Sequence, residues 1–278
     1  MSILKSWDGY LWYKNDRGIK VREKNVLKTL YSLSTKNTVF VDIGAHIGFY
    51  VIRLAKVCKH VHAIEPNPEA IEILKENIKL NKIKNVTIHP YALGKEVRKA
   101  NLYLADNNST LLTRSDRNSI EVQVKTFDEV IDYCDLVKID VEGFEEEVLL
   151  GAYRIITHVK PIWVIEHHDQ GLGSIYYPET KGMSERIRTI LKDYIKITFD
   201  VGRSVYIPKE KINEVKEEAL KRLISLAILN KIIKNLEEQR PWYYGMPYTW
   251  WYSMTLLDFY EELLERVLNE PEWLRISE

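Results

Sequence analysis

Acidic residues and histidines gather at the ends of two apolar segments of this sequence. The segment "KIDVEGFEEE" carries Asp140 and Glu142, and the segment "WVIEHHDQ" carries Glu166, His167 and His168. If both segments are neighbouring strands of a parallel sheet, these groups meet at its carboxyl edge. Carboxylates beside an imidazole can remove a proton from a substrate, or they can hold a divalent cation. Of these two alternatives we favour the metal-free one.

Adjacent residues of a strand face opposite sides of a sheet, so only one of the two histidines can point toward the acids. We predict that it is His167, and that Asp140, Glu142 and His167 are the catalytic residues. In the metal-dependent alternative, the ligands are Asp140, Glu166 and His167. The three glutamates at 145–147 are expected to form a solvated first helical turn, where negative charge is favourable.

A turn with two glycines, in "VFVDIGAHIGFY", connects a strand-like run to a helix-like run. Such a turn lets backbone approach a ligand closely and offers N–H donors at the start of the helix. The dinucleotide fingerprint G-x-G-x-x-G is not matched, which argues against NAD. An acid followed by glycines fits better, with a histidine that tolerates unusual backbone angles in place of a third glycine. A plain strand-to-helix turn is the alternative to a cofactor-binding turn at Asp42, Gly44, Ala45, His46 and Gly48.

The next strand-like run, "VHAIEPNP", ends on an acid. Glu65 stands directly before Pro66 and Asn67, where a carboxylate can accept hydrogen bonds from both hydroxyls of a ribose. A third run then ends in "HPYALG", where Tyr91 and Ala92 can line an adenine slot. We therefore predict that residues 65–67 and 91–92 complete the cofactor site.

Short β-branched runs alternate with helical patterns from Thr38 onward, which is typical of strands joined by crossover helices in a parallel sheet. An antiparallel ribbon is expected within residues 99–127, and a hairpin turning at Asp200 to Arg203 closes the sheet. We expect strands at "TVFVDI", "HVHAIEP", "VTIHPYAL", "LVKIDV" and "PIWVIEH", with covering helices at "FYVIRLAKVC", "EAIEILKENIKLNK" and Met183 to Asp193.

The predicted domains are an N-terminal extension over 1–37, a cofactor-binding domain over 38–207 and a helical appendage over 208–278. Seven aromatic residues crowd the appendage between Trp242 and Tyr252. They could close over a substrate as a lid, pack on the sheet domain or on a second subunit, or dock at a membrane interface. The sequence is therefore compatible with a homo-oligomer and with a peripheral contact to a membrane.

The net charge of the chain bears on the kind of partner it binds, and its cysteines and apolar runs bear on its cellular location. Lysine plus arginine and aspartate plus glutamate number 40 each, so the net charge gives no reason to expect a nucleic acid partner. The two cysteines, Cys58 and Cys134, have no metal-ligand spacing and are expected to be reduced core thiols. No apolar run reaches the roughly 18 residues of a membrane span, and no secretion signal is recognisable. We expect a cytoplasmic location.

Six segments in order, "VFVDIGAHIGFY", "AIEPNP", "ENIKLNKIKNV", "YALG", "TFDEV" and "LVKIDVEGFEEEVLLGA", resemble the FkbM family of S-adenosylmethionine-dependent methyltransferases. The resemblance covers Thr38 to His168 and stops before the appendage. It implies the α/β class I methyltransferase fold, Rossmann-like, with seven strands and an antiparallel final hairpin. It also implies S-adenosyl-L-methionine at the glycine turn and at Glu65. The family commonly has Asn where this chain has His46.

Members of this family mostly O-methylate sugars and small or glycosylated natural products, so the resemblance implies a glycan, glycolipid or glycosylated small molecule as acceptor. A sugar hydroxyl is a poor nucleophile, so a base or a metal near it should help to remove its proton. The alternative function is a non-catalytic protein that binds a ligand or partner on an inherited methyltransferase fold. The glycine turn, Glu65 and Asp140 together favour the enzyme.

Overall fold

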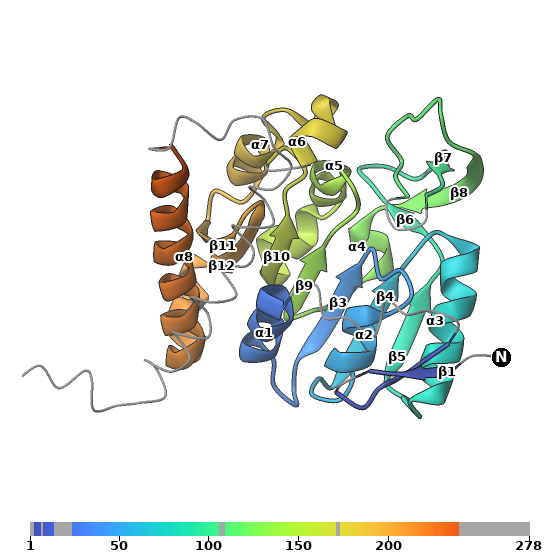
Figure 1. Cartoon of the computed structure of the whole chain (residues 1–278), viewed down its shortest axis with the longest axis horizontal. Helices are drawn as coiled ribbons and strands as arrows, with labels where there is room; N and C mark the ends of the chain where they lie inside the picture. Colours follow the sequence, from blue (N-terminus) through green and yellow to red (C-terminus); the bar gives the residue numbers. More distant parts are fainter. Residues whose placement is uncertain (1–2, 7, 14–23, 106–108, 171–172, 239–278) are drawn as a thin grey trace, which may run out of the picture.

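The computed structural model describes residues 3–6, 8–13, 24–105, 109–170 and 173–238. Within these ranges, a mixed seven-stranded sheet forms the centre of the molecule, with helices on both faces (Figure 1). The strand order is β11-β12-β10-β9-β3-β4-β5. The strands are β3 (Val39–Ile43), β4 (His60–Ile64), β5 (Val86–His89), β9 (Leu136–Ile139), β10 (Ile162–Glu166), β11 (Tyr194–Asp200) and β12 (Arg203–Pro208).

Strand direction in this sheet follows the prediction. β3, β4, β5, β9 and β10 run parallel to one another, whereas β12 lies antiparallel to both β10 and β11. The β11–β12 hairpin turns at Val201 and Gly202, inside the predicted segment. The seven-stranded class I methyltransferase architecture with its antiparallel final hairpin is therefore confirmed.

Alternating side chains of the sheet build two separate cores. Phe40 packs with α1, α2, α3 and α8 on one face, whereas its neighbour Val41 packs with α4, α5 and α7 on the other. This is the expected consequence of a strand that is buried on both sides. The covering helices are α1 (Lys24–Leu33), α2 (Phe49–Leu54), α3 (Pro68–Leu80), α4 (Phe127–Val130), α5 (Glu145–Leu150), α7 (Met183–Ile190) and α8 (Glu217–Glu238).

A small three-stranded sheet stands beside the main one, in the order β6-β8-β7. Its antiparallel β7–β8 pair is the predicted ribbon. The expected third strand "VTIHPYAL" is divided, because β5 ends at His89 and β6 pairs with β8 instead. The members are β6 (Ala92–Leu93), β7 (Arg98–Tyr103) and β8 (Ser119–Lys125).

The N-terminal extension is fastened to α3 by a short hairpin of β1 (Ile3–Lys5) and β2 (Leu11–Tyr13). The backbone N–H groups of Leu11 and Tyr13 donate to the side chains of Asn81 and Asn77, at 3.0 and 2.8 Å. Arg53 is fully buried against the hairpin, with its guanidinium 5.2 Å from the centre of the Trp12 ring. These contacts hold the extension to the face that carries α2 and α3.

Helix α8 forms most of the described part of the predicted appendage and packs against β11 and α1 (Figure 1). Its Leu223 and Leu226 are fully buried in the core of that face. The aromatic segment from Trp242 to Tyr252 lies outside the described residues. No helix within the described ranges is long and apolar enough to cross a membrane.

The remaining short helices lie around the carboxyl edge and the final strands. A π-helical turn, η1 (Ile155–Val159), leads into β10, and a 3-10 turn, η3 (Lys209–Glu214), follows β12. Helix α6 (Gly173–Tyr176) and the 3-10 turn η2 (Pro178–Thr180) form the segment between β10 and α7, at the end of the molecule where β10 finishes (Figure 1).

Candidate active site

The predicted cofactor turn has three residues in the left-handed backbone region: Gly44 (φ +84°), His46 (φ +48°) and Gly48 (φ +93°). A Cβ on Gly44 would lie 1.9 Å from the carbonyl oxygen of Asp140. A Cβ on Gly48 would lie 2.4 Å from Leu74 Cδ1 of α3. Both positions therefore favour glycine for conformation, and Gly44 also needs it for space, because a backbone carbonyl cannot move aside as the end of the Leu74 side chain can. The expectation that His46 tolerates an unusual backbone angle is confirmed.

Glu65, at the end of β4, connects this turn to the start of α3. Its carboxylate accepts the backbone N–H of His46 through Oε2 at 2.8 Å and that of Asn67 through Oε1 at 2.9 Å. The residue is only 6% exposed, and burial raises the pKa of its carboxyl to about 7 even though both N–H donors act against the shift. A buried carboxylate at this edge, next to a close-packed glycine turn, fits a nucleoside whose ribose hydroxyls donate to it.

The other predicted cofactor residues lie around Glu65. Asn67 accepts the Glu69 N–H at 3.0 Å and caps α3 directly after Pro66. Ala45 is buried, and its N–H donates to the Ile64 carbonyl at 3.1 Å. The backbone N–H groups of Glu65 and Tyr91 both donate to His89, which brings Tyr91 and its neighbour Ala92 to the same edge. Their contact with a cofactor stays a prediction.

A buried lysine that the sequence reasoning missed connects the two halves of the site. The Lys138 ammonium lies 3.5 Å from Asp42 Oδ1 and 3.3 Å from Asp140 Oδ2. Lys138 pairs with Asp42 across β9 and β3, so its side chain stands between the glycine turn and the acids. The sequence feature that could have revealed this lysine is its position as a lone cation inside the apolar run "LVKID". A buried strand accommodates a charged side chain only when the charge is paired.

The structure places His168, and not His167, beside the predicted acids. His168 Nε2 lies 3.2 Å from Glu142 Oε2 and 3.9 Å from Asp140 Oδ1. His167 points away, and its Nε2 lies 3.2 Å from the hydroxyl of Tyr206 on β12. Burial, aided by the charge of Lys196, lowers the pKa of His167 to about 3. The assignment of His167 to this cluster was therefore wrong, because the choice between the two faces could not be read from sequence.

Glu166 does not join the acid cluster either. Its carboxylate pairs with the Arg203 guanidinium of the neighbouring strand at 2.8 Å. The predicted metal set of Asp140, Glu166 and His167 is therefore not assembled among the described residues. The group that comes together instead is Asp140, Glu142 and His168, with one potential ligand atom from each within 4.8 Å of the others.

Glu145 corrects the expectation of a solvated first helical turn, because it is completely buried. Its Oε1 accepts the backbone N–H groups of Val141 and Gly143, each at 3.1 Å, and lies 2.8 Å from His168 Nδ1. One carboxylate thus holds both the loop that carries Glu142 and the ring of His168. Sequence reasoning missed Glu145 since three consecutive glutamates give no sign of which one faces inward.

Opposing effects set the protonation of this cluster. Burial acts to lower the pKa of His168, but the carboxylates of Glu145, Glu142 and Asp140 outweigh it and raise the pKa well above its ordinary value. Burial likewise opposes ionisation of Asp140, but the charges of Lys138, His168 and Arg203 lower its pKa. When no other cation is present, the carboxylates therefore favour the protonated form of the His168 imidazole.

Residues from two other segments fix Glu142, whose backbone is itself in the left-handed region (φ +55°). The Tyr177 hydroxyl donates to Glu142 Oε2 at 2.7 Å, and the Thr110 hydroxyl donates to the Glu142 carbonyl at 2.8 Å. Left-handed backbone in a glutamate costs energy and persists only where the surroundings impose it. Neither Tyr177 nor Thr110 was predicted from the sequence.

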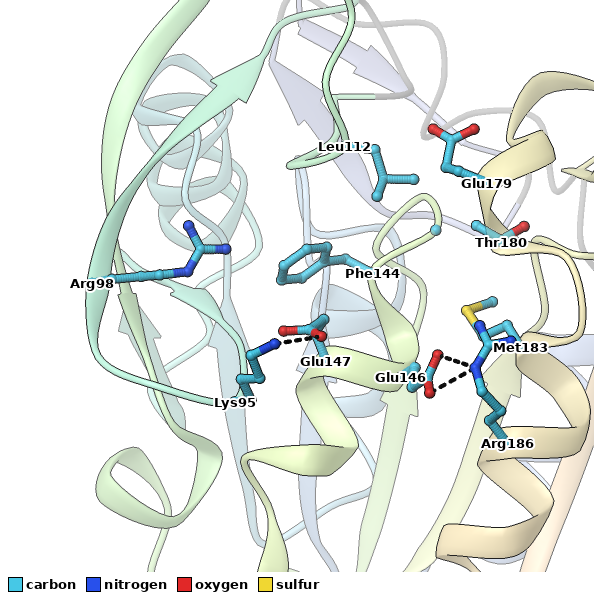
Figure 2. A pocket seen from close by; sticks show the side chains of 11 residues that line it. Lys95, Arg98, Leu112, Phe144, Glu146, Glu147, Glu179, Thr180, Met183 and Arg186 are labelled. Atoms are coloured by element: carbon cyan, nitrogen blue, oxygen red, sulfur yellow. Dashed lines mark hydrogen bonds and ion pairs between the residues drawn. The ribbon is translucent and has the colours of Figure 1, made fainter.

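A cavity of about 360 Å³ lies beside the loop that follows Glu142, and Asp140, Glu142 and His168 are not part of its lining (Figure 2). Gly143 and Phe144, which follow Glu142 directly, form part of its lining. Figure 2 shows Lys95 paired with Glu147 and Arg186 with Glu146 along its wall, and Arg98 pointing toward Phe144. A mixed polar and apolar lining of this kind suits a hydroxyl-rich ligand better than a purely apolar one.

Comparison of the sequence with models of protein families identifies the family of this chain. The model of the "Methyltransferase FkbM domain" matches residues 42–195, which span the glycine turn, Glu65 and the acid cluster. The chain belongs to the FkbM methyltransferase family. The resemblance noted in the sequence is thereby confirmed, and the matched range includes the residues gathered at the carboxyl edge.

Known relatives of this FkbM-family chain act on different molecules. The "Hexuronic acid methyltransferase AglP" of Haloferax volcanii is 26% identical over 156 residues, 52% of this chain and 62% of that protein. A "tRNA(Phe) (4-demethylwyosine(37)-C(7)) aminocarboxypropyltransferase" of Methanocaldococcus jannaschii is 51% identical over 61 residues, 21% of this chain and 24% of that protein. The match thus spans less than two thirds of either relative.

Among solved structures, the "Methyltransferase FkbM" of Methylobacillus flagellatus KT is similar with a TM-score of 0.45 and 22% identity. The match covers 62% of this chain and 44% of that one.

Proposed function

We propose that this FkbM-family methyltransferase transfers the methyl group of S-adenosyl-L-methionine to a hydroxyl of a sugar, on a glycan, a glycolipid or a glycosylated small molecule. The observation that carries the proposal is the contact between the glycine turn and the acid cluster. Gly44 lies against the Asp140 carbonyl, so a nucleoside cofactor on the turn and an acceptor at the acids would share one edge of the sheet. The hexuronic acid methyltransferase supports a sugar acceptor, because its match extends over half of this chain.

The cofactor would be held by residues that already have the required geometry. Glu65 would accept the ribose hydroxyls, and the turn from Gly44 to Gly48 would lie under the cofactor with its backbone. S-adenosyl-L-methionine supplies an electrophilic methyl group on a sulfonium. Methyl transfer from it requires the acceptor oxygen in line with the methyl carbon and sulfur, so the main task of the protein is to position the two molecules in a site that excludes water.

The acid cluster would handle the proton of the acceptor hydroxyl. The pKa of His168 is raised by its three carboxylate neighbours, and all of them compete for its ring nitrogens, so His168 is unsuited to be the base. Asp140 and Glu142 are the partly exposed carboxylates of the cluster, with side chains 23% and 18% exposed, and one of them would accept the proton as the oxygen attacks. His168, 3.9 Å from Asp140 Oδ1 and 3.2 Å from Glu142 Oε2, would hold both carboxylates in place.

The cavity beside Gly143 and Phe144 would receive the body of the acceptor. Its lining combines the apolar Leu112 and Phe144 with charged side chains of both signs: Lys95, Arg98, Arg186, Glu146, Glu147 and Glu179 (Figure 2). A sugar ring can pack on the apolar pair while its hydroxyls or an acidic group meet the charged side chains. An acidic sugar is the first acceptor class to test, because the relative with the longest match reported above is a hexuronic acid methyltransferase.

Binding of S-adenosylhomocysteine and of NAD should be compared by calorimetric titration of the full chain. We expect saturable binding of the first and none of the second; absence of S-adenosylhomocysteine binding would overturn the proposal. Transfer of labelled methyl to extracted glycans, glycolipids and uronic acid glycosides should then be measured beside transfer to tRNA. Labelling of tRNA alone would replace the sugar by a nucleic acid acceptor.

Asp140→Ala should abolish transfer while the fold is retained, and unchanged turnover would remove Asp140 from the mechanism. Cofactor binding without transfer to any acceptor would favour the second candidate, a non-catalytic binding protein on this fold.

A further inference from the structure

We propose that Asp140, Glu142 and His168 form a binding site for a divalent transition-metal cation such as Mn²⁺. The three residues come from the ends of two neighbouring strands: Asp140 and Glu142 follow β9, and His168 follows β10. One potential ligand atom from each lies within 4.8 Å of the others. This set differs from the one expected from sequence, since both Glu166 and His167 are replaced.

The distances suit a shared cation. His168 Nε2 lies 3.2 Å from Glu142 Oε2 and 3.9 Å from Asp140 Oδ1. Ligand atoms about 2.1 Å from a metal stand roughly 3 to 4 Å apart when they occupy neighbouring coordination positions. Only small side-chain movements would therefore bring the three atoms into one coordination sphere.

The residues around the cluster orient the three side chains as outer partners of metal ligands do. Fully buried Glu145 lies 2.8 Å from His168 Nδ1, which turns Nε2 toward the carboxylates. Metal-bound histidines usually present their second nitrogen to a carboxylate or carbonyl in this way. The Tyr177 hydroxyl donates at 2.7 Å to Glu142 Oε2, the oxygen that faces His168, and a second lone pair of this oxygen stays available to a metal. The Lys138 ammonium lies 3.3 Å from Asp140 Oδ2, whereas Oδ1 of the same carboxylate faces His168.

The donor set selects the class of metal. Two carboxylates with one imidazole suit Mn²⁺, Fe²⁺ or Zn²⁺, whereas Mg²⁺ and Ca²⁺ prefer oxygen ligands throughout. The side chains of Asp140 and Glu142 are 23% and 18% exposed, so one side of the site is open to solvent and to an acceptor. If the proposed function holds, a cation here would stand where the acceptor hydroxyl must lose its proton.

A different arrangement has the same distances: a protonated His168 that serves as the permanent cation between the carboxylates. The two arrangements differ in a measurable way, because the permanent imidazolium leaves no place for an added metal. Binding of Mn²⁺ to the full chain should therefore be measured by calorimetric titration and by electron paramagnetic resonance. We expect one saturable site with nitrogen coupling from a single imidazole.

The variants Glu142→Gln and His168→Gln should weaken Mn²⁺ binding at least tenfold, and His168→Gln should remove the imidazole coupling. Glu166→Gln and His167→Gln are the matched controls, and they should leave Mn²⁺ affinity within about twofold. Absence of a saturable site, absence of imidazole coupling in the unaltered chain, or coupling that disappears in His167→Gln would each overturn the proposal. Circular dichroism confirms that each variant is folded before its affinity is compared.

This experiment is independent of the proposed function. S-adenosylhomocysteine binding and methyl transfer without Mn²⁺ binding would overturn the metal site alone. Mn²⁺ binding without S-adenosylhomocysteine binding would keep the site and overturn the proposed function.

Discussion

The backbone of Gly44 lies against the carbonyl oxygen of Asp140, so closely that a Cβ on the glycine would come within 1.9 Å of it. The N–H of Asp140 also donates to the carbonyl of Ile43 at 3.1 Å. The turn predicted to bind the cofactor and the acid predicted to act on the acceptor are thus in direct backbone contact. A displacement of the Gly44 backbone should therefore affect both cofactor binding and the position of Asp140.

Gly44→Ala tests this contact. Left-handed backbone costs an alanine roughly 1 kcal/mol, and the clash with a backbone carbonyl that cannot rotate away adds to this. We expect a lower melting temperature and at least tenfold weaker S-adenosylhomocysteine binding, measured by thermal denaturation and calorimetry. Gly9→Ala is the matched control, because Gly9 has a similar φ of +87° but nothing within 4 Å of its added Cβ. Equal effects of the two variants would contradict a specific role for the Gly44–Asp140 contact.

Glu65 should make stability depend on pH. Its pKa is raised to about 7 in the folded chain by burial, so the folded state binds a proton more tightly than the unfolded state. The contribution of Glu65 to the free energy of unfolding is therefore fully present below about pH 4.5 and declines as pH rises toward 7. Urea denaturation of the unaltered chain and of Glu65→Gln, from pH 4 to 8, should show their difference changing in this window. A pH-independent difference would mean that Glu65 is not desolvated.

The same carboxylate should make cofactor affinity depend on pH in the opposite direction. Only the ionised form of Glu65 can accept hydrogen bonds from both ribose hydroxyls, so affinity for S-adenosylhomocysteine should rise as pH passes upward through about 7. Calorimetric titrations between pH 5.5 and 8.5 measure this rise. Glu65→Gln should bind at least tenfold more weakly at pH 8 and should lack the rise.

The two adjacent histidines should differ sharply when each is replaced by glutamine. His168→Gln should reduce kcat for methyl transfer at least a hundredfold, because His168 holds Asp140 and Glu142 in place. His167→Gln should leave kcat nearly unchanged and cost about 1 kcal/mol of stability through its contact with Tyr206. Steady-state kinetics and urea denaturation of both variants give the comparison. A larger loss of kcat in His167→Gln than in His168→Gln would contradict this assignment and would support His167 as the catalytic histidine.

Glu145 and Glu147 provide a similar pair on one helix. Glu145→Ala should lower the free energy of unfolding by about 3 kcal/mol, because two backbone N–H groups and the His168 ring lose their buried partner. Glu147→Ala removes only a surface pair with Lys95 and should cost less than about 1 kcal/mol. Urea denaturation of both variants measures the difference, and equal costs would show that the burial of Glu145 contributes nothing.

The sequence by itself determined the main architecture of this protein. Apolar runs that alternate with helical patterns specify a parallel sheet covered on both faces, because each element must bury its apolar side. The glycine turn and Glu65 were found for a related reason: a turn from strand to helix and an acid before a proline have fixed places in such a sheet. The residues from Gly44 to Gly48 and Glu65 accordingly lie at its carboxyl edge.

Only the tertiary structure decided which side chains meet at that edge. Neighbouring strand residues alternate between faces, so the sequence could not choose between His167 and His168 until β10 was paired with β9 and β12. Burial of Glu145 and Lys138 likewise depends on charges supplied from other elements, since a buried charge is stable only with a partner. The acid cluster is therefore a product of how β9, β10 and α5 pack together, which no single segment of the chain contains.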